Sequence, residues 1–76
     1  MKELLEYIAK ALVDKPDAVE VTVVEGEKSS ILQLKVDPED VGKVIGKQGR
    51  IAKAIRTVVR ASAVKEGKKA IVEIID

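Results

Sequence analysis

Residues 40–56 read Asp40-Val-Gly-Lys-Val-Ile-Gly-Lys-Gln-Gly-Arg-Ile-Ala-Lys-Ala-Ile-Arg56, and this stretch decides the fold. At its centre, Gly46 and Gly49 enclose Lys47 and Gln48. Helical patterns lie on both sides, and glycine favours the left-handed backbone conformations that end helices. The spacing therefore predicts a tight corner between two helices, with bare backbone that an anion can approach.

The sequence before this corner predicts one helix and a β-hairpin. Apolar residues recur at helical spacing over Lys2–Asp14, and Pro16 stops that helix. Val19–Val23 and Leu32–Val36 then alternate apolar and polar residues with a period of two, as strands do. The polar connection Glu25–Ser30 has hairpin length, so we expect the two strands to pair antiparallel.

The sequence around and after the corner predicts two helices and a third strand. Asp37 as an N-cap acceptor and Pro38 at the first helical position start a short helix, which Gly46 ends. A longer helix follows over about Arg50–Lys65, and the β-rich segment Ala70–Ile75 closes the chain as a strand. The expected inner face of the longer helix comprises Ile51, Ala54, Ile55, Val58, Val59 and Ser62.

The resulting element order is α-β-β-α-α-β, in one domain that spans residues 1–76. A helical crossover between two strands of one sheet makes them parallel and is right-handed. We therefore expect an α/β fold of the α+β class. It is a two-layer sandwich in which three helices cover one face of a three-stranded mixed sheet.

Charge is divided unevenly along the chain. The formal net charge is +1, yet residues 41–64 carry no acid and six cations: Lys43, Lys47, Arg50, Lys53, Arg56 and Arg60. The remaining residues hold 8 cations and all 13 acids, a net charge of −5. At about 100° per residue, Lys53, Arg56 and Arg60 fall within a narrow arc of the longer helix. This segregation indicates a local field directed at an anionic partner.

The composition argues against an enzyme, a metal site and a bound cofactor. The chain contains no Cys and no His, which removes thiolate ligands, the commonest imidazole ligand and the usual general base. A P-loop is also excluded, because three residues rather than four separate Gly42 from Gly46, and Gln48 rather than Ser or Thr follows Lys47.

The composition also limits how the chain could recognise a nucleic acid and where it resides. Tyr7 is the only aromatic residue, so a surface that stacks bases on several aromatic rings cannot be built. Apolar runs stay well short of the roughly 18 residues that suggest a membrane span. The N-terminus mixes charges where a signal peptide would be apolar. We therefore expect a cytoplasmic protein without a membrane partner.

Residues 40–56 closely resemble the signature of the K-homology (KH) family. The core Ile45–Ile51 is similar to the family pattern I-G-x-x-G-x-x-I, with Ile51 one place earlier and Ala52 at the final position. The element order resembles the bacterial type II KH arrangement. In length the chain is similar to stand-alone bacterial KH proteins, and the resemblance covers essentially all of it.

This resemblance implies a site that holds about four nucleotides of a single strand. It implies that Gly46 and Gly49 let a phosphate approach the backbone, that Lys47 and Arg50 supply cations, and that Gln48 donates to phosphate or sugar. The full expected RNA-binding set is Lys43, Val44, Ile45, Gly46, Lys47, Gln48, Gly49, Arg50, Ile51, Lys53, Ala54 and Arg56. The bases are expected on an aliphatic groove of Val44, Ile45, Ile51, Ala54 and Ile55.

The family further implies a non-catalytic RNA chaperone or post-transcriptional regulator. Its expected partners are single-stranded RNA and either a second copy of the chain, as a homodimer, or a second bacterial KH protein of the KhpB (Jag/EloR) type. Two alternatives stay open: a protein–protein adaptor with weak or no RNA binding, and a single-stranded DNA binder. Lys47 and Gln48 argue against the adaptor, which has no need of an acid-free loop.

Overall fold

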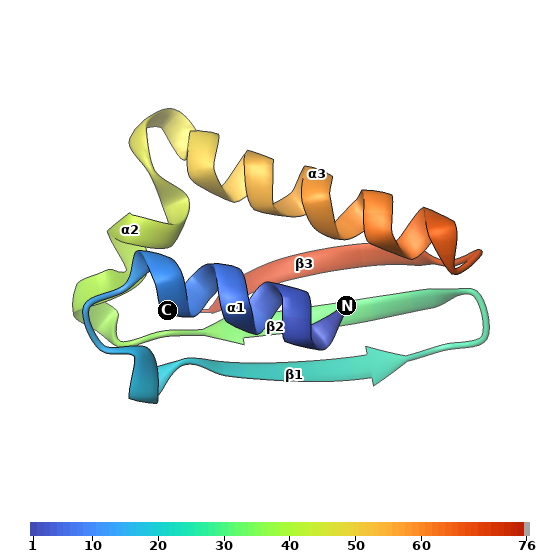
Figure 1. Ribbon diagram of the computed structural model, residues 1–76, viewed down its shortest axis with the longest axis horizontal. Helices are drawn as coiled ribbons and strands as arrows, with labels where there is room; N and C mark the ends of the chain where they lie inside the picture. Colours follow the sequence, from blue (N-terminus) through green and yellow to red (C-terminus); the bar gives the residue numbers. More distant parts are fainter. Residues whose placement is uncertain (76) are drawn as a thin grey trace.

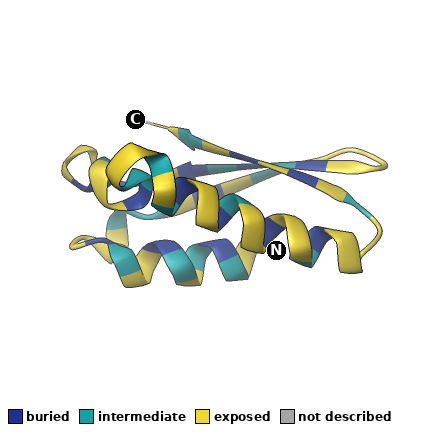
Figure 2. Cartoon of the chain, turned by 90° about the horizontal axis from the view of Figure 1, so that it is seen from above, coloured by how far each residue is buried: buried dark blue, intermediate teal, exposed yellow. Residues whose placement is uncertain are grey.

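The computed structural model describes residues 1–75, and its element order is the one the sequence predicts. The helices and strands are α1 (Lys2–Leu12), β1 (Glu20–Glu25), β2 (Ser29–Lys35), α2 (Val41–Ile45), α3 (Arg50–Lys65) and β3 (Lys69–Ile75). Helices and strands form two layers (Figures 1 and 2). The α+β class is confirmed.

The sheet combines one antiparallel and one parallel pair, in the order β1-β2-β3. Val21 of β1 lies opposite Leu34 of β2, and Leu32 of β2 lies opposite Val72 of the parallel strand β3. The hairpin and the parallel crossover were both predicted correctly. β3 lies at one side of the sheet, and in Figure 1 α3 lies above it and approaches it toward the end where the two elements are joined.

The core lies between the sheet and the helices, and aliphatic side chains fill it. Alternate residues of each strand face the helices, and the helices contribute small and branched side chains. The largest fully buried apolar side chains are Leu5, Leu32, Leu34, Val36, Val44 and Val59. Burial of one such side chain contributes about 1.5–3 kcal/mol. A core without aromatic rings is therefore sufficient for this small domain.

The first helix is shorter than predicted. α1 ends at Leu12, whereas the apolar spacing suggested a helix to Asp14. The backbone N–H groups of Asp14 and Lys15 donate to the carboxylate of Asp40, at 3.2 and 3.0 Å, so they are committed to a distant residue. A tertiary contact therefore ends this helix two residues before its pattern does.

The inner face of α3 is also rotated from the predicted one. The residues that α3 buries are Ala52, Ile55, Val59 and Ala63. Ala54 and Val58, which were expected inside, are exposed, and 44% of the Val58 surface is accessible. The buried face of α3 packs toward β3 and the core, whereas Ala54 and Val58 line the groove beside α1. The apolar spacing in the sequence could not show which residues of α3 face the sheet and which face α1.

Candidate nucleic-acid interface

The corner between α2 and α3 is a short loop, residues 46–49, which we call the glycine loop. Gly46 ends α2 with φ +77° and ψ 174°, and Gly49 precedes α3 with φ +73° and ψ 14°. Gln48 between them has φ +56°, and it is the one non-glycine residue among residues 1–75 with a positive φ. A left-handed conformation costs a residue with a side chain about 1–2 kcal/mol. Such local strain is characteristic of ligand-binding loops.

The two glycines of the loop face different surroundings. A Cβ atom built on Gly46 would lie 2.5 Å from Cγ1 of Ile51, so a side chain has no room there. A Cβ atom on Gly49 would meet nothing within 4 Å. Gly46 thus permits close packing of the corner, whereas Gly49 leaves bare backbone facing open space. A ligand can approach the loop from the Gly49 side.

The surroundings of the glycine loop are electropositive. Lys47 and Arg50 are exposed, and the N-terminal end of α3 adds the partial positive charge of the helix dipole. Arg50 Nη2 lies 3.5 Å from Oε1 of Gln48, so the guanidinium stays close to the loop. A helix N-terminus together with nearby cations favours phosphate groups.

Lys43 is placed near the loop, but it is paired with acids. Its Nζ donates to Asp14 Oδ2 at 2.7 Å and to Asp40 Oδ1 at 3.2 Å. The hydrogen bonds from these two carboxylates raise the pKa of Lys43. A phosphate at this position would compete with two carboxylates that are already in place. Lys43 was expected to contact RNA, and the structure shows that its ammonium is already bonded to two carboxylates.

Asp40 anchors this arrangement. Only 1% of its surface is accessible, and its carboxylate accepts the backbone N–H groups of Asp14 and Lys15 as well as the Lys43 ammonium. Burial acts to raise the pKa of Asp40, but the Asp14 N–H, the Lys43 ammonium and the Lys15 N–H together outweigh burial and lower it. The charged carboxylate therefore ties the segment after α1 to the start of α2, which carries the glycine loop.

Val44 cannot serve as the predicted contact for a base. Its side chain is fully buried in the core, with 0% of its surface accessible. The helical period of α2 turns this residue toward the sheet and leaves the exposed positions to Gly42 and Lys43. Its neighbour Ile45 keeps part of its surface accessible. The expectation for Val44 was wrong because a five-residue helix can bury only one face, and Val44 lies on that face.

The remaining predicted contacts lie on two opposite flanks of α3. An apolar groove lies between α1 and α3, with the lining residues Ile8, Leu12, Arg50, Ile51, Ala54, Ile55 and Val58. About half a turn away, Lys53 and Arg56 form what we call the cationic flank, on the side of β3. Arg56 Nε lies 3.4 Å from the main-chain oxygen of Val72 in β3. The predicted aliphatic groove and the cations thus do not share one surface.

The edge of β3 was missed by the sequence reasoning. It runs along the cationic flank, within reach of Arg56, and brings main-chain polar groups of a sheet edge next to the cations. The signal for it was present: a last strand that pairs in parallel with the second strand leaves its other edge beside the crossover helix.

Two other kinds of site are absent from residues 1–75. This part of the chain brings together no group of three or more acidic side chains that could hold a metal ion. Within the same residues, no helix has the length and apolar character needed to cross a membrane.

Comparison with known proteins gives consistent matches. The family model described as KhpA/KhpB, KH domain, matches residues 2–74. The RNA-binding protein KhpA of Clostridium perfringens is 73% identical and that of Clostridium acetobutylicum 72%, each over 99% of this chain and 100% of the relative. The RNA-binding protein KhpA of Aquifex aeolicus is 51% identical, over 100% of this chain and 96% of the relative.

A solved structure shares the fold. A crystal structure of Era from Aquifex aeolicus bound to GDP·AlF4− superimposes with a TM-score of 0.64. The match covers 96% of this chain and 28% of the Era chain, at 22% sequence identity. At this identity the similarity concerns the fold alone.

Proposed function

The chain belongs to the KhpA/KhpB family of KH domains, and from this premise we propose that it is an RNA-binding protein that holds a single strand at its glycine loop. Membership confirms the resemblance seen in residues 40–56. The observation that carries the proposal is the open, left-handed backbone at Gly49 beside exposed cations and the N-terminal end of α3. The chain acts by binding, without catalysis, as an RNA chaperone or post-transcriptional regulator in the cytoplasm.

The phosphate contact follows from the loop geometry. With no side chain on Gly49, a phosphate can come close to the backbone, where the N–H groups that enter α3 favour its negative charge. Lys47 adds a mobile point charge, and Arg50 adds a planar guanidinium held near Gln48. The positive φ of Gln48 turns the backbone sharply between the two glycines, so the loop is compact and its exposed side chains stand beside the start of α3.

We propose that the strand continues from the loop along the cationic flank. From Arg50, which lines the start of the groove facing α1, the strand passes to Lys53 and Arg56 on the opposite, β3 side of α3. The groove itself is apolar. The sugar–phosphate backbone then lies over the cations, and the bases lie toward the edge of β3 near Val72. A sheet edge offers N–H and C=O groups that can pair with base edges. Duplexes are excluded, because their bases are not free to turn into such a surface.

Fluorescence anisotropy across a salt series tests this proposal, with single-stranded RNA, matched DNA and duplex RNA as ligands. Binding of the single strand should weaken with salt, since each neutralised phosphate releases counterions. The double variant Lys47→Asp/Gln48→Asp should fold and lose binding. Lys2→Asp/Tyr7→Asp makes the same change in charge on exposed positions of α1 and should bind normally. Full binding by the folded loop variant would refute the site. If the matched single-stranded DNA binds as tightly as the RNA, the ligands of the chain include single-stranded DNA as well as RNA.

We also propose that the chain self-associates or pairs with a second KH protein through the apolar groove between α1 and α3. The groove is lined almost wholly by aliphatic side chains, and Val58, one of its lining residues, keeps 44% of its surface exposed. One small site binds weakly, so two linked sites raise affinity through avidity. Sedimentation velocity of Val58→Asp tests the idea: an unchanged oligomeric state would exclude this surface. Association without any RNA binding would favour the adaptor function.

A further inference from the structure

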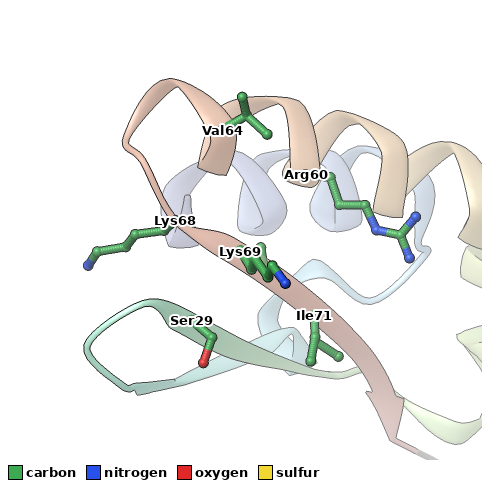
Figure 3. Close-up of a pocket in the computed structure, with 7 residues that line it drawn as sticks. Ser29, Arg60, Val64, Lys68, Lys69 and Ile71 are labelled. Carbon is green, nitrogen blue, oxygen red and sulfur yellow. The ribbon is translucent and has the colours of Figure 1, made fainter.

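A second pocket opens at the end of α3 that lies farthest from the glycine loop. Seven residues line it: Ser29, Arg60, Val64, Lys68, Lys69, Ala70 and Ile71 (Figure 3). Its volume is about 360 Å³, within the range of sites that hold small organic groups. At 1.5 Å per residue, Val64 is about 21 Å along the helix from Arg50. The pocket is therefore a separate place on the molecule, which we call the distal pocket.

The distal pocket combines exposed apolar surface with cations. Val64 and Ile71 expose 73% and 53% of their surfaces, so both side chains are available for an apolar contact. In Figure 3 the side chains of Arg60 and Lys69 extend to the same side, next to Ile71. Lys68 points the other way, and its Nζ lies 3.6 Å from Glu25. The pocket thus offers an apolar contact with two positive charges beside it.

The cationic flank leads to this pocket. Positions 53, 56, 60 and 64 succeed one another at intervals of three or four residues, so their side chains lie along one stripe of α3. The stripe begins next to the glycine loop with Lys53, continues with Arg56 and Arg60, and ends at Val64 in the distal pocket. Arg56 shows that this stripe faces the edge of β3, the strand that forms the floor of the pocket.

We propose that the distal pocket is a second RNA contact, which binds the part of the strand beyond the nucleotides held at the glycine loop. This inference rests on the proposed function, because the loop fixes where the strand starts. A base lies against Val64 and Ile71, and the adjoining phosphates lie on Arg60 and Lys69. A single-stranded polyanion with apolar bases complements this mixture of charge and apolar surface. The footprint of the chain on RNA is then longer than the roughly four nucleotides of one KH site.

Two RNA lengths separate the distal pocket from the glycine loop. We would measure the salt dependence of binding for an oligonucleotide of about four nucleotides and for one of about eight, twice the length that a KH site holds. In Arg60→Gln/Lys69→Gln, the slope of log K against log salt should become shallower by about 1.4 for the longer RNA, since each phosphate on a single strand contributes about 0.7. The slope for the shorter RNA should not change.

The matched control is Lys2→Gln/Lys10→Gln, which removes two exposed charges from α1. An equal change in slope for this control would mean that the effect comes from the overall charge of the protein, and it would overturn the proposal. An unchanged slope for the longer RNA, or an equal change for both lengths, would also overturn it. Amide shifts of Val64 and Ile71 that respond to the longer RNA alone would support the pocket directly.

The proposed function can fail independently of this inference. If Lys47→Asp/Gln48→Asp still binds the shorter RNA, the glycine loop is not the primary site. The distal pocket is judged only by what Arg60→Gln/Lys69→Gln does to the longer RNA relative to the shorter one.

Discussion

Gly46 and Ile51 are packed against each other across the glycine loop, so that a Cβ atom on Gly46 would lie 2.5 Å from Cγ1 and 2.9 Å from Cβ of Ile51. Ile51 stands in the first turn of α3 and packs against the core. The close approach of backbone and side chain fixes the angle at which α3 leaves α2. The first glycine of the loop is therefore required by the fold, whereas the second, Gly49, is free to serve the ligand.

Gly46→Ala should destabilise the domain. Its φ and ψ lie in a region that is nearly exclusive to glycine, which costs about 1–3 kcal/mol, and overpacking against Ile51 adds about 1–3 kcal/mol. Urea denaturation would measure the loss. The control is Gly42→Ala in α2, where a Cβ meets nothing within 4 Å and alanine should stabilise the helix by about 0.5–1 kcal/mol. Equal stability of the two variants would contradict the packing argument.

Gly49→Asn should keep the fold and weaken RNA binding. Asn tolerates the left-handed conformation and the space around Gly49 is empty, so the cost should stay below about 1–2 kcal/mol. The added side chain occupies the space through which a phosphate approaches. Gly67→Asn, which has φ +72° and equal room at the other end of α3, is the control. Thermal melts and anisotropy with the short RNA would distinguish them; weakened binding in both variants would count against the loop.

Asp40→Asn should destabilise the domain in a way that depends on pH. The pKa of Asp40 in the folded protein is lowered from its ordinary value of 3.8, so its contribution to stability is complete above that pH. The contribution is lost as the pH falls through the lower folded pKa. The difference in urea midpoint between wild type and Asp40→Asn should therefore be large at neutral pH and shrink under strongly acidic conditions. Asp17→Asn, in the exposed turn Pro16–Ala18, should show no such trend. A gap that stays constant with pH would refute this role.

Lys43→Met and Lys47→Met should have opposite effects. Lys43 is held by Asp14 and Asp40, so its loss should lower stability and change RNA affinity little. Lys47 is exposed beside the open loop, so its loss should leave stability unchanged and make the salt slope of RNA binding shallower by about 0.7. Urea midpoints and anisotropy on both variants provide the comparison. A larger loss of affinity in Lys43→Met would show that the lysine leaves its carboxylates to bind RNA.

Several features were predictable because they depend on neighbours in sequence. The side chain of Asp37 accepts a hydrogen bond from the N–H of Glu39 at 2.9 Å, as expected of a helix start. Gly46 ends α2 and Gly49 precedes α3, as the glycine spacing indicated. The period-two patterns located both hairpin strands. In each case the backbone conformation is set by residues within a few positions.

The errors arose where a distant segment decides. The end of α1 depends on Asp40, which lies 25 residues from Lys15 along the chain, and Lys43 donates to Asp14, which lies 29 residues away. Val44 was predicted to be at the surface because the sequence pattern of a short helix indicates which residues share a face. The pattern does not indicate which face packs against the sheet. For the same reason, the apolar groove and the cations of α3 were predicted to lie on one surface, although they lie on opposite flanks of the helix.

The sequence by itself determined the order of elements, the left-handed glycine loop and the segregation of six cations, because these follow from local backbone preferences and covalent order. The tertiary structure alone decided how the surface is used. It paired Lys43, buried Val44, divided the apolar and cationic flanks of α3, and set the edge of β3 along the cations. Those outcomes depend on which surfaces meet when α1, α3 and the sheet pack together. Helical periodicity shows which residues share one side of a helix, but it does not show which element packs against that side.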